Sequence, residues 1–189
     1  MIFRSYFHAA SEHEIVVTDR EDGLPRYLTE RSDERRLGLA AMASCSIPLL
    51  NRPVALDGRF YYDGGVGDSI PVGRALSKGY GKVVAVLTRR AGVYPKVGSK
   101  AQAAYRVFFR NDPQFREALL SRPARYRAQV AYLNRLESQG RAFVIRPQVP
   151  ELSHLEKNPE LAASYYRHGY TWMAGRWPDL QAFLSREPE

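Results

Sequence analysis

The chain has 189 residues, 44% hydrophobic and 25% charged, a balance typical of a folded globular protein and unlike that of a disordered one. Its single cysteine, Cys45, excludes an internal disulfide and any zinc site built on several cysteines. The net charge of +8 is compatible with nucleic acid or anionic lipid as a partner, but no nucleic-acid-binding motif accompanies it.

Other classes of protein are disfavoured by what the sequence lacks. No apolar stretch approaches the roughly 20 residues of a membrane span, and the first residues lack the apolar centre of a secretory signal. We therefore expect a cytoplasmic protein whose contact with a membrane, if it makes one, is peripheral. The histidines show no metal-ligand spacing and no phosphate or dinucleotide loop is present, so we expect no metal and no cofactor.

The first half of the chain predicts strands separated by capped helices. Residues 14–19 and 26–30 predict two partner strands, and residues 49–56 predict a loop. Ser32 or Asp33 is expected to cap a helix that runs through Ala43. This pattern places Cys45 in the core as an inert thiol.

The segment Arg59–Pro71 is the most informative part of the sequence. Residues 59–62 predict an aromatic strand, in which Tyr61 and Tyr62 face opposite sides, one in the core and one beside a cleft. Asp63 follows, with Gly64 and Gly65 directly after it. An acid at a strand end beside glycines is a candidate catalytic carboxylate, because glycine lets the backbone turn tightly and approach a ligand. The same residues fit a simple turn that Asp63 only caps.

The next segment predicts the class of fold. Asp68 or Ser69 is expected to cap a helix that ends before Gly79. The β-branched run Lys82–Thr88 is typical of a strand buried on both faces of a parallel sheet. Strand 59–62, this helix and strand 82–88 predict a βαβ unit, and hence an α/β core.

From about residue 97 the sequence is mainly helical and rich in arginine. Helices are predicted over residues 101–109 and 113–138, and a short strand over residues 142–147. Asn158 is expected to cap a helix through Arg176, and Pro178 to begin a final short helix.

A catalytic carboxylate at Asp63 would need a nucleophile as its partner. The strained turn Gly-x-Ser-x-Gly is absent, and its nearest equivalent, Gly67–Pro71, has proline in place of the second glycine. Ser69 is therefore interpreted as a helix cap. Asp19 is expected to order its own loop through backbone N–H groups, and Ser44 and Ser46 to satisfy the end of the preceding helix.

Several motifs, in this order, resemble the later half of a bacterial patatin-like phospholipase. They are Val16–Asp19, Ala43–Pro48, Asp57-Gly58, Tyr62–Gly65 and Ile70-Pro71. The most specific is Asp63-Gly64-Gly65, which follows Ala-Ser-x-Ser-x-Pro at the family's spacing. The resemblance extends from about residue 13 to 90 and is loose beyond it.

The resemblance implies an α/β/α sandwich with a mainly parallel sheet, and a lipid acyl-ester hydrolase that uses a Ser–Asp dyad. Asp63 would be the dyad acid, with Gly64 and Gly65 supporting its turn, and neither histidine nor cofactor is required. Residues 1–96 would form the C-terminal half of the catalytic domain, and residues 97–189 a helical region packed on the same domain.

The family's Gly-rich oxyanion loop and Gly-x-Ser-x-Gly precede the matching part and do not occur in this sequence. We therefore expect a fragment that carries half of the dyad and is inactive alone. Strand 82–88 would lack a neighbour, which predicts dimerisation through that edge or association with the missing segment. The alternative is a non-catalytic basic module that binds anionic membrane surfaces; nucleic acid is not an expected partner.

Overall fold

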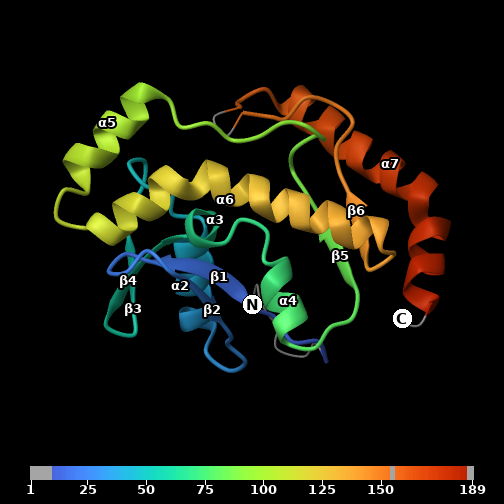
Figure 1. Ribbon diagram of the computed structural model, residues 1–189, viewed down its shortest axis with the longest axis horizontal. Helices are drawn as coiled ribbons and strands as arrows, with labels where there is room; N and C mark the ends of the chain where they lie inside the picture. Colours follow the sequence, from blue (N-terminus) through green and yellow to red (C-terminus); the bar gives the residue numbers. More distant parts are fainter. Residues whose placement is uncertain (1–9, 154–155, 187–189) are drawn as a thin grey trace. The chain divides into compact units, whose positions relative to one another are not determined.

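The computed structural model describes residues 10–153 and 156–186 (Figure 1). These residues separate into two units. Unit 1 contains residues 10–70 and 96–126, and unit 2 contains residues 71–95, 127–153 and 156–186.

Unit 1 is built on a four-stranded sheet with the order β2-β1-β4-β3. The strands are β1 (Ile15–Asp19), β2 (Pro25–Leu28), β3 (Val54–Leu56) and β4 (Arg59–Asp63). All three pairings are antiparallel, and the central pair sets Val17 opposite Asp63. The predicted strands at residues 14–19, 26–30 and 59–62 are thereby confirmed.

The prediction of a loop over residues 49–56 is wrong at its end, because Val54–Leu56 forms β3. This strand pairs with β4 through a two-residue turn at Asp57 and Gly58, whose φ angles are 51° and 76°. Two consecutive positive φ angles match the twist of antiparallel strands, which is why Asp-Gly is a strong hairpin signal. The sequence did not predict β3 because three residues are too few to show the alternation of apolar and polar side chains that marks a strand.

The prediction of an α/β protein is confirmed, whereas the mainly parallel sheet is not. The only parallel pairing among the described residues joins β5 (Val83–Val86) to β6 (Ala142–Ile145). The predicted βαβ unit is wrong, because β4 and β5 belong to different sheets. The β-branched run correctly indicated a strand with parallel pairing, but the proximity of this strand to β4 in the sequence did not indicate which sheet it joins.

Strand β5 is also not buried on both faces. Ala85 is buried, but its neighbours Val84 and Val86 are 42% and 71% exposed. β-Branched residues favour a strand wherever one face is packed, so their run identified the element and not its burial.

The core of unit 1 lies on both faces of β4. Tyr61 packs in a cluster with Val17 and with residues of α2 (Glu34–Ser44). Tyr62 packs on the other face, its ring stacked on that of Phe115 with centroids 4.9 Å apart. Both tyrosines are only 5% exposed, so the prediction that one of them borders a cleft is wrong. Covering on both faces makes β4 a rigid base for the turn that follows it.

The helices of unit 1 begin largely where the sequence indicated. They are α2, the single turn α3 (Gly64–Gly67), α5 (Ser99–Phe108) and the first part of α6 (Pro113–Ser138), which continues into unit 2. Asp33 caps α2 as predicted, its carboxylate accepting from the amides of Arg35 and Arg36. Cys45 lies at the end of α2 and is exposed, so its assignment to the core is wrong. The apolar run before it is buried on one helix face only.

Unit 2 consists of α4 (Val72–Ser77), β5, the second part of α6, β6 and α7 (Pro159–Ser185). Asn158 caps α7 as predicted. Pro178 does not begin a new helix but lies inside α7. Leu180 and Phe183 of α7 pack on Phe143 of β6, next to which α7 runs in Figure 1. Met173, which precedes the proline, packs against the same cluster, so α7 is held on the strand on either side of Pro178. No helix of the described residues is both long and apolar enough to cross a bilayer.

Candidate functional site

Asp63 lies at the end of β4, where its main chain is fixed from two sides. Its N–H donates to the carbonyl of Ser46 at 3.0 Å. Its carbonyl accepts from the Thr18 hydroxyl at 2.8 Å. Both partners come from segments that precede β4 by many residues, so the position of Asp63 depends on the tertiary fold and not on the local turn alone.

The Asp63 carboxylate is held by one oxygen. Oδ1 accepts from the N–H of Gly65 at 2.7 Å, which makes Asp63 the N-cap of α3. The side chain is half-buried, and among the described residues Oδ2 has no hydrogen-bond or ion-pair partner. The prediction that Asp63 caps a turn is therefore confirmed. It leaves one carboxylate oxygen available for other chemistry.

Two glycines of α3 allow the backbone to pack closely against the neighbouring strands. A Cβ atom on Gly64 would lie 2.1 Å from the carbonyl oxygen of Val16. A Cβ atom on Gly67 would lie 3.0 Å from the nitrogen of Pro25. Glycine is required at Gly64 for close approach, which brings the turn after Asp63 directly onto β1.

Thr18 is a site residue that the sequence analysis missed. Its fully buried hydroxyl donates to Asp63 and accepts from the N–H of Gly67 at 2.9 Å. One side chain therefore ties both ends of α3 to β1. The available signal was a hydroxyl residue inside the apolar run Ile15–Thr18, since a buried polar side chain needs partners.

The other predicted polar residues have structural contacts. Asp19 orders its loop as predicted, its Oδ1 accepting from the Glu21 N–H at 2.9 Å. Ser46 satisfies the end of α2 through the Met42 carbonyl at 2.8 Å, also as predicted. Neither Asp68 nor Ser69 caps α4, which begins after Pro71 without a side-chain cap. The Ser69 hydroxyl instead donates to the carbonyl of Gly65 at 2.6 Å.

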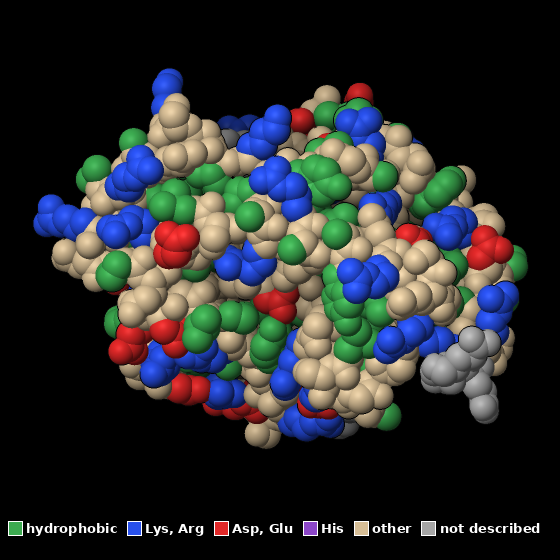
Figure 2. Space-filling view, viewed as in Figure 1, with side chains coloured by type: hydrophobic (Ala, Val, Ile, Leu, Met, Phe, Trp, Pro, Cys, Tyr) green, Lys and Arg blue, Asp and Glu red, His purple; other side chains and the backbone are tan. Residues whose placement is uncertain are grey.

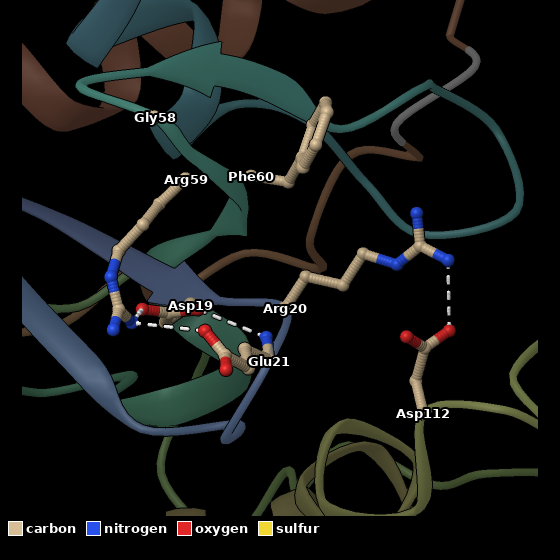
Figure 3. Close-up of a pocket in the computed structure, with 7 residues that line it drawn as sticks. All are labelled: Asp19, Arg20, Glu21, Gly58, Arg59, Phe60 and Asp112. Atoms are coloured by element: carbon tan, nitrogen blue, oxygen red, sulfur yellow. Dashed lines mark hydrogen bonds and ion pairs between the residues drawn. The ribbon is translucent and has the colours of Figure 1, made fainter.

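A pocket of about 280 Å³ opens at the opposite end of β1 and β4 (Figure 3). Its lining residues are Asp19, Arg20, Glu21, Gly58, Arg59, Phe60 and Asp112. The charged groups largely pair with one another, as Figure 3 shows for Arg20 with Asp112 and for Arg59 with Asp19. The hydrogen bond to Asp112 raises the pKa of Arg20. The lining contains no hydroxyl, thiol or imidazole and does not include Asp63, so this pocket offers no nucleophile.

Metal ligation has no candidate in the described part of the chain, where no three His, Cys, Asp or Glu side chains group together. The chemistry that the Asp63 site can offer is that of a carboxylate. A strand-end aspartate with one oxygen held by a backbone amide and the other unengaged is suited to accept a proton from a substrate or a nucleophile. Fold and site together define an α/β protein with an Asp-Gly-Gly turn suited to general-base chemistry.

Two family profiles match the chain. Residues 5–76 match the family described as Patatin-like phospholipase, and residues 112–185 match a Domain of unknown function (DUF6363). No curated protein matches the chain. The match over residues 5–76, which include the Asp63 turn, is consistent with a patatin-like family. At the level of the family, this indicates a lipid acyl hydrolase.

Proposed function

We propose that the chain contributes the catalytic base of a lipid acyl hydrolase, with Asp63 as the acid of a Ser–Asp dyad. The observation that supports this role is the Asp63 carboxylate, with Oδ1 held by Gly65 and Oδ2 without a partner among the described residues. The family match over residues 5–76 supports a lipid ester as the substrate class.

In this mechanism Asp63 accepts the proton of a serine as the serine attacks the ester carbonyl. Asp63 passes this proton to the leaving alcohol as the acyl-enzyme forms. Again a carboxylate, Asp63 then accepts a proton from a water molecule that attacks the acyl-enzyme, and the fatty acid leaves as the serine regains its proton. Gly64 and Gly65 take part by letting α3 start directly at the carboxylate. Gly-x-Ser-x-Gly and a Gly-rich oxyanion loop do not occur in residues 1–189. We therefore propose that these residues alone do not hydrolyse esters.

The assembly of the active form is part of the same proposal. Residues 1–96 belong to the catalytic domain, and residues 97–189 form a helical region of that domain. The exposed edge of β5 is the proposed contact with a nucleophile-bearing segment or with a second copy of the chain. Support for this edge comes from the pairing of β5, which has β6 as its single strand partner among the described residues. Val84 and Val86, on one face of β5, are also apolar and exposed.

No observation favours the alternative of a basic module for anionic membranes. Figure 2 shows Lys and Arg side chains spread over the visible face, with Asp and Glu among them, and not gathered on one element. A surface of mixed sign is what solubility alone requires.

The test compares hydrolysis of a p-nitrophenyl ester by two proteins. One is residues 1–189, and the other is the same chain fused to the nucleophile half of a patatin-like hydrolase. We expect activity in the fusion alone, its loss in Asp63→Asn, and its retention in Asp112→Asn, which alters the pocket of Figure 3. Activity of the fusion that survives Asp63→Asn would refute the role of Asp63. Turnover by residues 1–189 that Asp63→Asn abolishes would refute their inactivity.

A further inference from the structure

The carbonyl group of Gly65 is held by two donors from different parts of the chain. Arg122, on α6, donates through Nε at 2.8 Å, and the Ser69 hydroxyl donates at 2.6 Å. Arg122 follows Gly65 by 57 residues and belongs to the same unit. A hydrogen bond from a charged donor is stronger than one between neutral groups, so Arg122 is a firm anchor for this peptide group.

Gly65 is also the residue that holds the Asp63 carboxylate. Its N–H donates to Asp63 Oδ1 at 2.7 Å while its carbonyl is held by Arg122. The α3 turn contains three glycines in four residues, and glycine leaves the backbone more conformational freedom than any other residue does. Fixing the carbonyl side of Gly65 limits the rotation of its backbone and therefore the direction of its N–H.

The guanidinium group lies near the carboxylate without neutralising it. A Cβ atom on Gly65 would be 3.1 Å from Asp63 Oδ1 and 3.4 Å from Arg122 Nη2, so both groups border the same small space. Among the described residues Asp63 forms no ion pair. A direct ion pair would favour the charged carboxylate and weaken it as a base. Arg122 instead binds the carbonyl of Gly65, the residue whose N–H orients the carboxylate.

A second arginine of α6 holds the next carbonyl. Arg125 Nη2 donates to the Val66 carbonyl at 2.7 Å and to the Ala118 carbonyl at 2.8 Å. Burial lowers the pKa of Arg125, and the nearby Asp68 carboxylate opposes that shift. Arg122 and Arg125 therefore donate hydrogen bonds to two successive carbonyls of α3, those of Gly65 and Val66. Both lie in the segment that matches the domain of unknown function.

We propose that Arg122 is a positioning residue for Asp63, so that the segment matching the domain of unknown function supplies part of the dyad site. Arg122 acts through Gly65: it fixes the carbonyl of this residue and so limits the rotation of the backbone whose N–H sets the orientation of the Asp63 carboxylate. This inference rests on the proposed function of Asp63. It gives the first turns of α6 a role in catalysis that neither family match assigns.

The first test measures hydrogen exchange at the Gly65 amide in residues 1–189 and needs no activity. Arg122→Met keeps an apolar stem and removes the donor, and Arg122→Lys restores a donor. Arg127→Met, at an exposed position of α6, is the matched control. We expect Gly65 to exchange at least about tenfold faster in Arg122→Met, less so in Arg122→Lys, and unchanged in Arg127→Met. Equal exchange in wild type and Arg122→Met would overturn the proposal.

The second test measures ester hydrolysis in the fusion to a nucleophile half. We expect Arg122→Met to lower kcat with KM unchanged, and Arg122→Lys to recover part of kcat, an outcome that a loss of stability alone does not produce. Faster exchange at Gly65 with unchanged kcat, in a fusion that Asp63→Asn inactivates, overturns the positioning role alone. A fusion insensitive to Asp63→Asn overturns the proposed function, and the role of Arg122 with it.

Discussion

Gly64→Ala should be among the most destabilising small substitutions in unit 1. The added Cβ would lie 2.1 Å from the carbonyl oxygen and 2.5 Å from the carbonyl carbon of Val16, closer than real Cβ atoms come to other atoms. Val16 belongs to β1, which pairs with β2 on one side and β4 on the other, so its backbone has little room to retreat. Overpacking costs about 1–3 kcal/mol, and an immovable backbone places this case near 3 kcal/mol. For a chain of this length the loss corresponds to a fall in Tm of roughly 6–12 °C.

The matched control is Gly38→Ala. Gly38 lies inside α2, and a Cβ there would have no atom within 4 Å. Alanine in a helix interior is favoured over glycine, so this variant should gain about 0.5–1 kcal/mol. Urea unfolding followed by far-ultraviolet circular dichroism gives both free energies. If Gly64→Ala unfolds at the wild-type urea concentration, α3 does not pack on β1 as described.

Two further predictions concern charged groups of unit 1. The pKa of Glu30 is lowered to about 2, chiefly by hydrogen bonds from the Asp33 and Ser32 amides and by Arg36. Because the folded pKa is below the unfolded one, the stabilisation is complete above about pH 4.5 and is lost as the pH falls toward 2. Glu30→Gln should therefore flatten acid unfolding in this window, and an unaltered acid profile would contradict the assignment. Asp19→Asn should lower the free energy of unfolding by about 2 kcal/mol, because Asp19 is 1% exposed and paired with Arg59; urea unfolding measures this loss. Glu21→Gln, at a side chain 78% exposed, should change the free energy of unfolding little. Equal effects of the two variants would count against the buried pair.

The elements that sequence alone predicted are those with local signals. Asp33 and Asn158 cap helices because their side chains reach amides two and three residues onward. The Asp57-Gly58 turn follows from the φ angles that these residues tolerate. The prediction that was wrong concerned a non-local pairing. Lys82–Thr88 contains a strand, as predicted, but its partner β6 comes after a long helix. Composition cannot identify a partner that distant.

The candidate site was predictable to a similar extent. Asp63 could be singled out because glycines follow it directly. The residues that fix it could not, since Thr18 and the Ser46 carbonyl come from other elements and Arg122 comes from α6. In the sequence the segment that forms α6 shows only as helical and rich in arginine, and only the fold shows that Arg122 and Arg125 bind carbonyls.

The two interpretations of Asp63, turn cap and catalytic base, are not alternatives in this fold. Capping uses Oδ1 and the Gly65 amide, and proton transfer requires only one oxygen in a fixed orientation, which Oδ2 supplies. A catalytic carboxylate gains from such a cap, because an unanchored side chain would spend most of its time away from the serine. The N-terminal position on α3 therefore serves both roles. The contacts of Gly65 with Arg122 and Ser69 extend the same constraint one peptide further from the carboxylate.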